Sequence, residues 1–148
     1  MKALTFTSKW EGGWADLKDD PGGKTNYGIS DAGDGSVDGL IDLDRDGRGD
    51  VAVSDLTREQ AIKIYWDHYW LPSGCPNMDL PLAVVVFDTA VNCGIGRARG
   101  FLKDCVDTKM YINRRIDFYV KLVKRNPKLN RFYKGWINRV VDLRKYVE

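Results

Sequence analysis

Hydrophobic residues recur at helical spacing through the second half of the chain. The longest apolar run, at 82–94, predicts a buried helix rather than a strand, because it is long and ends on a glycine. Two further helices are expected at about 96–107 and 109–125. A last helix is expected after Asn126-Pro127, a pair that suits a cap and a first turn. The pattern predicts a helical bundle with the 82–94 segment at its centre.

The first half of the chain alternates short helical segments with turn-rich sequence. Residues 3–11 predict a short helix that Gly12-Gly13 would end, so Glu11 stands at a helix C-terminus. Between Trp14 and Val53 the chain is rich in Gly, Asp and Pro, which favours loops and a small β-ribbon.

A second helix of this half is predicted by its start signal. Thr57, followed three residues later by Gln60, predicts a capping box for a helix that runs to about Trp70. The sequence has no repeat, low-complexity tract or linker, so one domain over 1–148 is expected. The expected class is mainly α with a small β/loop lobe.

Charge is divided unevenly along the chain. Residues 1–60 hold 7 Lys/Arg against 13 Asp/Glu, and the rest holds 16 against 8. The basic half would suit phosphate-rich polymers or nucleic acid, but it carries no nucleic-acid recognition motif and the acidic half would repel a phosphate backbone. We therefore expect no nucleic-acid partner.

Export and membrane signals are absent from the sequence pattern. No apolar run approaches ~18 residues, and the first residues carry no Sec signal, so we expect neither Sec export nor stable membrane insertion. The three cysteines lack metal-type spacing and are interpreted as reduced packing residues: Cys75, Cys93 and Cys105.

Three consecutive motifs carry the most functional information. They are Glu11-Gly12-Gly13-Trp14, Asp19-Asp20-Pro21-Gly22-Gly23 and Thr25-Asn26-Tyr27-Gly28-Ile29. In order and spacing they resemble the signature of the glycoside hydrolase family 108 muramidases, which occur in phage endolysins and bacterial secretion-activator proteins. Further fragments resemble the same family: Tyr65, Tyr69-Trp70, 87–94 and 135–140. The chain differs from the family pattern at Trp14, at Cys93 and in the acidic stretch 31–53.

The resemblance implies a lysozyme-like α+β fold and an N-acetylmuramidase that hydrolyses the β-1,4 MurNAc-GlcNAc bond of peptidoglycan. Residues 1–95 would hold the catalytic motifs and the acidic loop 31–53, and 96–148 would form a C-terminal helical region that is a candidate for wall binding. A phage enzyme of this kind, a monomer without a catalytic cofactor, would accumulate in the host cytoplasm. It would act on the wall in the periplasm after holin-mediated release.

Glycosidic cleavage requires a carboxylic acid that keeps its proton near neutral pH. Glu11 is the candidate, because Trp10 and Trp14 supply apolar surface that favours the protonated form. The alternative is an exposed Glu at a helix end, where the helix dipole also disfavours negative charge.

A second group must activate water or stabilise the developing positive charge. The order Glu11, Asp20, Thr25 resembles the catalytic order of phage-type lysozymes, with the Thr one residue early. Asp19 is a rival for this role, and Asp20 before a proline is also typical of a turn. Asp19 is also a candidate for binding substrate. Tyr27 is a candidate for sugar stacking.

Asn92 is a candidate for hydrogen bonding to the sugar, and packing or capping is the alternative for both Tyr27 and Asn92. Two other classes of function stay open, namely a lytic transglycosylase and a non-catalytic peptidoglycan-binding or secretion-accessory module. His68 is the only histidine, which leaves little for Ser-His-Asp or multi-His zinc chemistry, and we expect it on a helix surface.

The stretch 42–50 resembles a calcium-binding loop of the EF-hand type, with side-chain oxygens at positions 1, 3, 5 and 9 and a glycine at 6. A structural Ca²⁺ is therefore expected here, with a solvated acidic loop as the alternative. The candidate ligands are Asp42, Asp44, Asp46, Arg48 and Asp50.

Position 12 of this loop is Val53 rather than a carboxylate, although Asp55 lies close by. An overlapping register is also open, through Asp34, Ser36, Asp38 and Asp42.

Overall fold

The computed structural model describes residues 2–11, 25–30 and 37–148. The chain divides into two compact units, which are described separately. The helical unit comprises Met1–Phe6 and Tyr69–Glu148, and the hairpin unit comprises Thr7–His68. Among the described residues, no helix is both long and apolar enough to cross a membrane.

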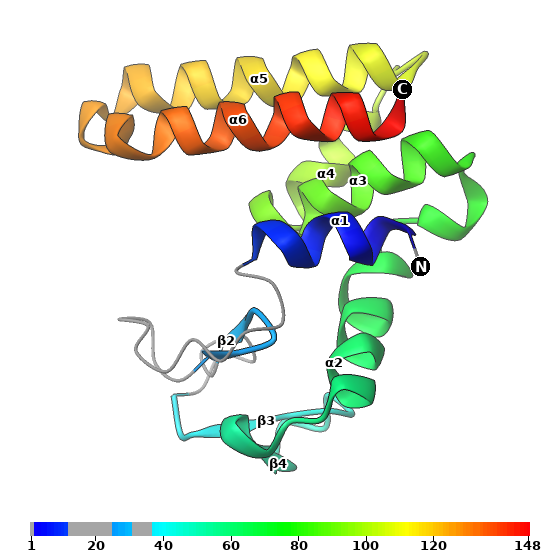
Figure 1. Cartoon of the computed structure of the whole chain (residues 1–148), viewed down its shortest axis with the longest axis vertical. Helices are drawn as coiled ribbons and strands as arrows, with labels where there is room; N and C mark the ends of the chain where they lie inside the picture. The colour runs from blue at the N-terminus through cyan, green and yellow to red at the C-terminus, as the bar shows by residue number, and fades with distance from the viewer. Residues whose placement is uncertain (1, 12–24, 31–36) are drawn as a thin grey trace. The chain divides into compact units, whose positions relative to one another are not determined.

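The helical unit is organised around α3, Leu80–Cys93, whose residues 83–90 are all buried. It contacts the three helices that follow it, and this confirms the expectation of a central helix at 82–94. These are α4 (Ile95–Leu102), α5 (Thr108–Arg125) and α6 (Asn130–Val147). The last two lie side by side as a long pair (Figure 1).

Aromatic packing joins these helices. The Tyr119 ring of α5 stacks on the Trp136 ring of α6 with centroids 5.1 Å apart. The Trp70 ring meets Phe87 of α3 edge-on at 5.7 Å. Tyr146 of α6 donates a hydrogen bond to the carbonyl of Lys2 at 3.0 Å, which ties the first residues of α1 (Lys2–Trp10) to the end of the chain.

Two helix boundaries differ from the sequence prediction. Helix α4 ends at Leu102 rather than near 107, because Asp104 takes a positive φ of 55° that no helix continues. Arg114 of α5 then donates to the carbonyl of Phe101 at 2.8 Å, a group that the helix end would leave unpaired. The Asn126-Pro127 pair caps a 3₁₀ turn, η5 (Pro127–Leu129), and α6 begins only at Asn130.

The described residues of the hairpin unit form two short antiparallel strand pairs, the end of α1 and helix α2 (Arg58–Tyr65). Strands β1 (Thr25–Asn26) and β2 (Ile29–Ser30) form one pair, and β3 (Leu40–Ile41) and β4 (Val51–Ala52) form the other. A 3₁₀ turn, η2 (Val53–Asp55), leads from β4 toward α2. Helix α2 continues as a π-helical turn, η3, over Trp66–Trp70.

The predicted capping box of α2 is confirmed. The Thr57 hydroxyl accepts the amide of Gln60 at 3.2 Å, and the Gln60 side chain accepts the amide of Thr57 at 2.9 Å. The core of the unit gathers β3, η2 and α2 around a few buried residues: Ile41, Val53, Leu56, Ala61 and Ile64. The expected class, mainly α and lysozyme-like with a small β/loop lobe, is confirmed.

Candidate active site

Glu11 directly follows α1 in the hairpin unit. Its amide donates to the carbonyl of Thr7 at 3.0 Å, so the helical hydrogen bonding extends to Glu11 itself. The residue is half-buried. The expectation that Glu11 stands at the C-terminal end of a helix is confirmed, and its backbone is anchored by that helix.

The turn that joins β1 to β2 consists of Tyr27 and Gly28. Both have positive φ, 54° and 74°, as a two-residue type I′ hairpin turn requires. Gly adopts this backbone without steric cost, whereas an aromatic residue with positive φ is strained by about 1–3 kcal/mol. Such strain persists only where surrounding contacts enforce it, and it is typical of functional sites.

The contacts that hold this turn come from Glu11 and Tyr65. The Tyr65 hydroxyl at the end of α2 donates to the carbonyl of Tyr27 at 3.0 Å, and Tyr65 is itself buried. A Cβ built on Gly28 would lie 2.8 Å from the Tyr65 oxygen and 3.0 Å from the Glu11 Cβ. The structure therefore brings together two of the predicted site residues, Glu11 and Tyr27, and adds Tyr65 to them.

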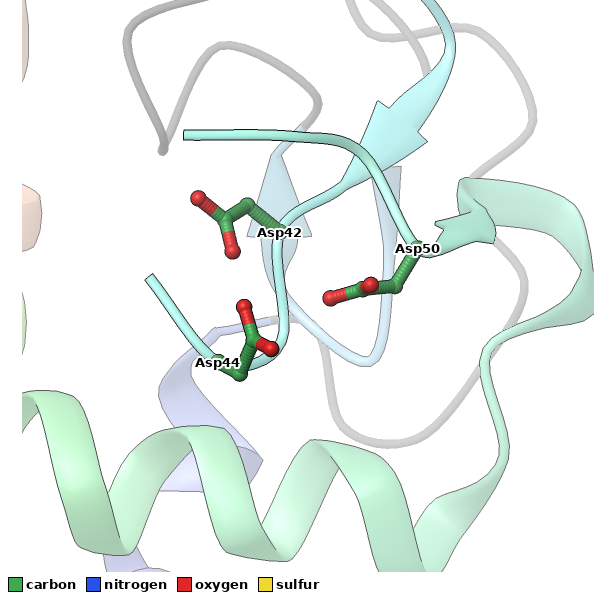
Figure 2. A group of neighbouring side chains, drawn as sticks. All are labelled: Asp42, Asp44 and Asp50. Carbon is green, nitrogen blue, oxygen red and sulfur yellow. The ribbon is translucent and has the colours of Figure 1, made fainter. Parts of the chain in front are cut away.

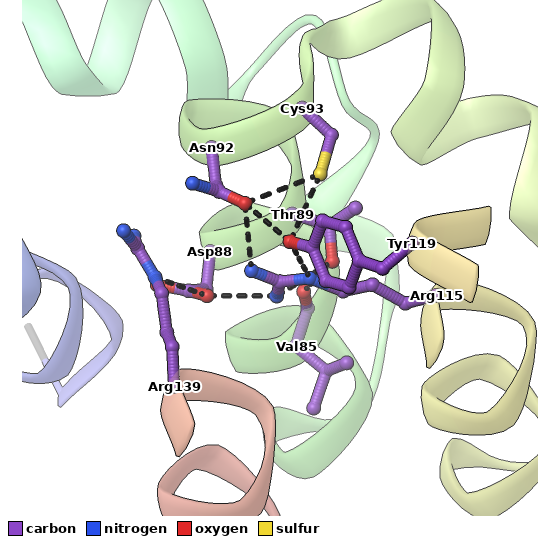
Figure 3. Close-up of polar contacts among 8 residues, drawn as sticks. All are labelled: Val85, Asp88, Thr89, Asn92, Cys93, Arg115, Tyr119 and Arg139. Carbon is purple, nitrogen blue, oxygen red and sulfur yellow. Dashed lines mark hydrogen bonds and ion pairs between the residues drawn. The ribbon is translucent and has the colours of Figure 1, made fainter. Parts of the chain in front are cut away.

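Asn92 lies in the helical unit, near the end of α3. Its side-chain oxygen accepts from Arg115 at 3.3 Å, from Cys93 at 3.3 Å and from the Tyr119 hydroxyl. These donors fix which end of the amide is oxygen, and the amide nitrogen points away from them (Figure 3). The oxygen of Asn92 is thus used inside the unit.

The same network contains a fully buried carboxylate, Asp88. It lies between Arg115 and Arg139, and each guanidinium comes within 2.8 Å of one of its oxygens (Figure 3). Burial alone would raise the Asp88 pKa, but the two guanidinium charges outweigh it and hold the pKa below the ordinary value. Asp88 therefore stays ionised and joins α3 to α5 and α6.

In the hairpin unit, the acidic loop between β3 and β4 brings three carboxylates together. Oxygens of Asp42, Asp44 and Asp50 all lie within 4.8 Å of one another, and the three side chains converge in Figure 2. Burial opposes ionisation of Asp42, but hydrogen bonds from the amides of Gly47 and Arg45 lower its pKa. The loop thus presents carboxylate oxygens at its centre.

The other two predicted ligands are placed differently. Asp46 lies outside the group of three, and its carboxylate accepts the amide of Arg48 at 2.8 Å. Asp38 of the alternative register accepts the amide of Leu40 at 3.0 Å, while Asp34 and Ser36 lie outside the described residues. The structure groups oxygens from loop positions 1, 3 and 9 only.

His68, the last residue of the hairpin unit, is half-buried rather than on the surface as expected. Its Nε2 is buried and has no hydrogen-bond partner within the described ranges. Burial, followed by the positive charge of Arg45, lowers the pKa of His68 and favours the neutral ring.

Comparison with known families gives one result. The model of the family described as Glycosyl hydrolase 108 matches residues 4–94, more than half of the chain. The chain belongs to this family. No curated protein and no solved structure matches it.

Membership of glycosyl hydrolase family 108 makes the chain a glycoside hydrolase. The match includes Glu11, the Tyr27–Gly28 turn, Tyr65 and the buried Asp88, and it ends at Gly94, before α4. The part of the sequence that matches the glycosidase family therefore includes Glu11 and the turn and tyrosine that contact it.

The structure does not test three of the predicted catalytic residues of this glycoside hydrolase. Asp19 and Asp20 lie outside the described residues, and only the backbone of Thr25, in β1, is described. The choice of a partner for Glu11 among these three stays a prediction.

Sequence reasoning gave no role to Tyr65 or Asp88. A signal for Asp88 existed, because a single carboxylate inside a long apolar run must find cationic partners when it is buried. Nothing in the local sequence of Tyr65 indicates its hydrogen bond to a turn 38 residues earlier.

We predict that Gly28→Ala destabilises the chain more than Gly39→Ala does. Both glycines have positive φ, 74° and 81°, but nothing lies within 4 Å of a Cβ on Gly39. The control therefore carries only the backbone strain, about 1–2 kcal/mol, and Gly28→Ala adds about 1–3 kcal/mol of overpacking against Tyr65 and Glu11. Urea denaturation measures both. Equal losses would contradict the close approach.

We predict that Asp88→Asn lowers the free energy of unfolding by about 3–5 kcal/mol at neutral pH, since it leaves two buried guanidinium groups without a counter-charge. Asp104→Asn is the control, because Asn tolerates positive φ at this exposed position and should change stability by less than about 0.5 kcal/mol.

The contribution of Asp88 to the free energy of unfolding should decrease at acidic pH. The folded-state pKa is lowered, so the contribution is complete above about pH 4 and is lost as pH falls through the folded-state value. The stability difference between wild type and Asp88→Asn should therefore narrow below about pH 4 in denaturation series. A gap that stays constant or widens there would show that Asp88 is not the titrating group.

Proposed function

We propose that the chain is an endolysin-like N-acetylmuramidase that hydrolyses the β-1,4 bond between N-acetylmuramic acid and N-acetylglucosamine, with Glu11 as its general acid. The observation that carries the proposal is the position of Glu11. It stands at the end of α1, half-buried against the strained Tyr27–Gly28 turn, inside the part of the chain that matches a glycosidase family.

In the proposed reaction the Glu11 carboxyl group donates its proton to the glycosidic oxygen. The bond between this oxygen and C1 of the muramic acid breaks, the glucosamine leaves with a free 4-hydroxyl, and positive charge develops at C1. Water then adds to C1 and generates a reducing end. A second group must assist the water or stabilise the charge, and Asp20, Asp19 and Thr25 are the candidates.

The surroundings of Glu11 support its role as a positioned acid. Proton donation requires the carboxyl group to stay within hydrogen-bond reach of the leaving oxygen. The helical hydrogen bond to Thr7 and the contact with Gly28 restrain Glu11 from two sides. Tyr27, held by Tyr65, is proposed to stack on a sugar ring.

In the helical unit, Asn92 is separately proposed to donate its outward amide hydrogens to substrate.

We predict that Glu11→Gln lowers the rate of clearing of outer-membrane-permeabilised Gram-negative cells by about 10²- to 10⁴-fold, the contribution of a general acid. Gln has nearly the same shape but has no acidic proton to give. Glu59→Gln, an exposed carboxylate in the first turn of α2, is the matched control and should retain full activity. Equal clearing by Glu11→Gln and wild type would rule out Glu11 as the acid.

We further propose that the acidic loop holds a structural Ca²⁺ through Asp42, Asp44 and Asp50, with Asp46 and Arg48 as the remaining candidate ligands. The donor set fits, because Ca²⁺ prefers carboxylate and carbonyl oxygens and tolerates irregular geometry. A bound cation would also relieve the mutual repulsion of three carboxylates within 4.8 Å.

We predict that metal-free protein binds Ca²⁺ with measurable heat in calorimetric titration and gains melting temperature, since a ligand that binds only the folded state stabilises it. Asp44→Asn should weaken Ca²⁺ binding by about tenfold or more. Its side-chain oxygen can still accept the backbone amide of Asp46, as the Asp44 carboxylate does at 3.0 Å. Glu59→Gln should bind as wild type does. The absence of both heat and thermal gain in wild type would refute the site.

A further inference from the structure

A groove with a concentrated positive charge lies between α4 and α5 of the helical unit. Its volume is about 360 Å³. It lies beyond residues 4–94, so neither the family match nor the proposed catalysis involves it. Four cations line it against a single carboxylate, and the remainder of the lining is apolar: Arg97, Arg114, Lys121, Arg125, Asp117, Phe101, Phe118 and Leu122.

Two of the cations make no ion pair in the described part of the chain, although Asp117 stands one helical turn before Lys121. Lys121 and Arg125 are exposed and stand four residues apart on α5, where their side chains are neighbours and repel each other. Among the described residues, neither makes a hydrogen bond or an ion pair with its side chain. An anion placed between them would gain two charge-assisted contacts without displacing a protein partner.

The other two cations are already oriented. The Arg97 guanidinium lies 4.2 Å above the Phe118 ring, a cation–π contact that holds it at the groove. Arg114 donates to the carbonyl of Phe101 at 2.8 Å. This hydrogen bond fixes the position of its positive charge at the groove. The groove therefore combines two held cations with two that are available to a ligand.

Aromatic surface lies directly beside this charge. Phe101 and Phe118 are half-buried, with ring centroids 5.9 Å apart and a tilt of 53° between them. Aromatic rings offer a negative face to the C–H groups of a sugar ring. Because the two half-buried rings line a groove rather than project from the surface, they suit a small ligand better than the flat surface of a bilayer.

The single carboxylate of the groove restricts further the chemical class of ligand that the groove can bind. Asp117 is exposed on α5, and within the described chain its carboxylate makes no hydrogen bond or ion pair. It would repel a bare inorganic anion, but it can accept hydrogen bonds from hydroxyl groups. A ligand that satisfies all three kinds of group carries a phosphate, hydroxyls and an apolar C–H face.

We infer that the α4–α5 groove binds a phosphorylated sugar. The phosphate lies at Lys121 and Arg125, the sugar ring packs on Phe101 beside Phe118, whose ring the Arg97 guanidinium overlies, and sugar hydroxyls donate to Asp117. The groove volume of about 360 Å³ is near the lower end of small-ligand sites, which suits one or two sugar rings. The inference does not depend on the muramidase activity of the chain.

The test is calorimetric titration of the full chain at low salt with N-acetylglucosamine 1-phosphate, N-acetylglucosamine and inorganic phosphate. We expect the phosphorylated sugar to bind about tenfold more tightly than either fragment, because only it engages the cations and the rings together. Inorganic phosphate binding as tightly would reduce the groove to a simple anion site, and the plain sugar binding as tightly would remove the role of the cations. Either result overturns the inference.

Matched variants assign the binding to the groove. Lys121→Gln with Arg125→Gln should weaken binding of the phosphorylated sugar by about tenfold or more. Lys124→Gln with Lys128→Gln removes the same charge from exposed positions outside the lining and should leave binding within about twofold. Equal weakening by both double variants would mean that only net charge matters, and this would overturn the inference.

A vesicle-binding experiment tests the remaining alternative, in which the groove binds a lipid surface. We expect the Lys121/Arg125 double variant and wild type to co-sediment equally with phosphatidylglycerol vesicles. Loss of vesicle binding in the variant, together with no heat from the phosphorylated sugar, would assign the groove to a lipid surface instead. All these measurements can be repeated with Glu11→Gln, so failure of the proposed catalysis and failure of the groove are distinguishable.

Discussion

The backbone of Gly28 lies close to Glu11, and the geometry of the proposed active site depends on this contact. Gly28 has both the positive φ of the hairpin turn and the close approach to Glu11 and Tyr65. Any larger residue would press against the Tyr65 hydroxyl and the Glu11 Cβ. A catalytic acid works only when its position is held to within about 0.5 Å, so a packed turn on one side and a helix on the other are suitable supports.

The helical unit is held by a different constraint, a buried charge that must be paired. Asp88 on α3 cannot lose either guanidinium without leaving a charge in a dry interior, so α5 and α6 are held to the central helix in one arrangement. The same Arg115 reaches Asn92 and thereby fixes the orientation of its amide. A candidate substrate contact and the packing of the unit thus share one side chain.

The sequence was informative where local chemistry decides the structure. The apolar run of α3, its terminal glycine and the Thr57–Gln60 capping box could each be predicted, because their determinants lie within a few residues of one another. The spacing of the acidic loop indicated a cluster of oxygens that included Asp46 and Arg48, and the structure brings together three of its members, Asp42, Asp44 and Asp50.

What could not be predicted depends on tertiary contacts. The early end of α4 follows from the backbone of Asp104 and from Arg114, ten residues later. The partners of Asp88 stand 27 and 51 residues away, and the hydrogen bond of Tyr65 to the hairpin turn joins residues 38 apart. The Glu11 motif identified a candidate acid, but the turn that restrains it is visible only in three dimensions.

The proposed chemistry leaves a distinct mark on its products, because the broken bond decides which sugar carries the new end. Mass spectrometry of purified peptidoglycan sacculi digested by the full chain tests this most directly. The account predicts soluble fragments with reducing N-acetylmuramic acid ends, formed by wild type and absent after incubation with Glu11→Gln. Fragments with 1,6-anhydro ends would indicate a transglycosylase, reducing N-acetylglucosamine ends would indicate another bond, and either result would contradict the account.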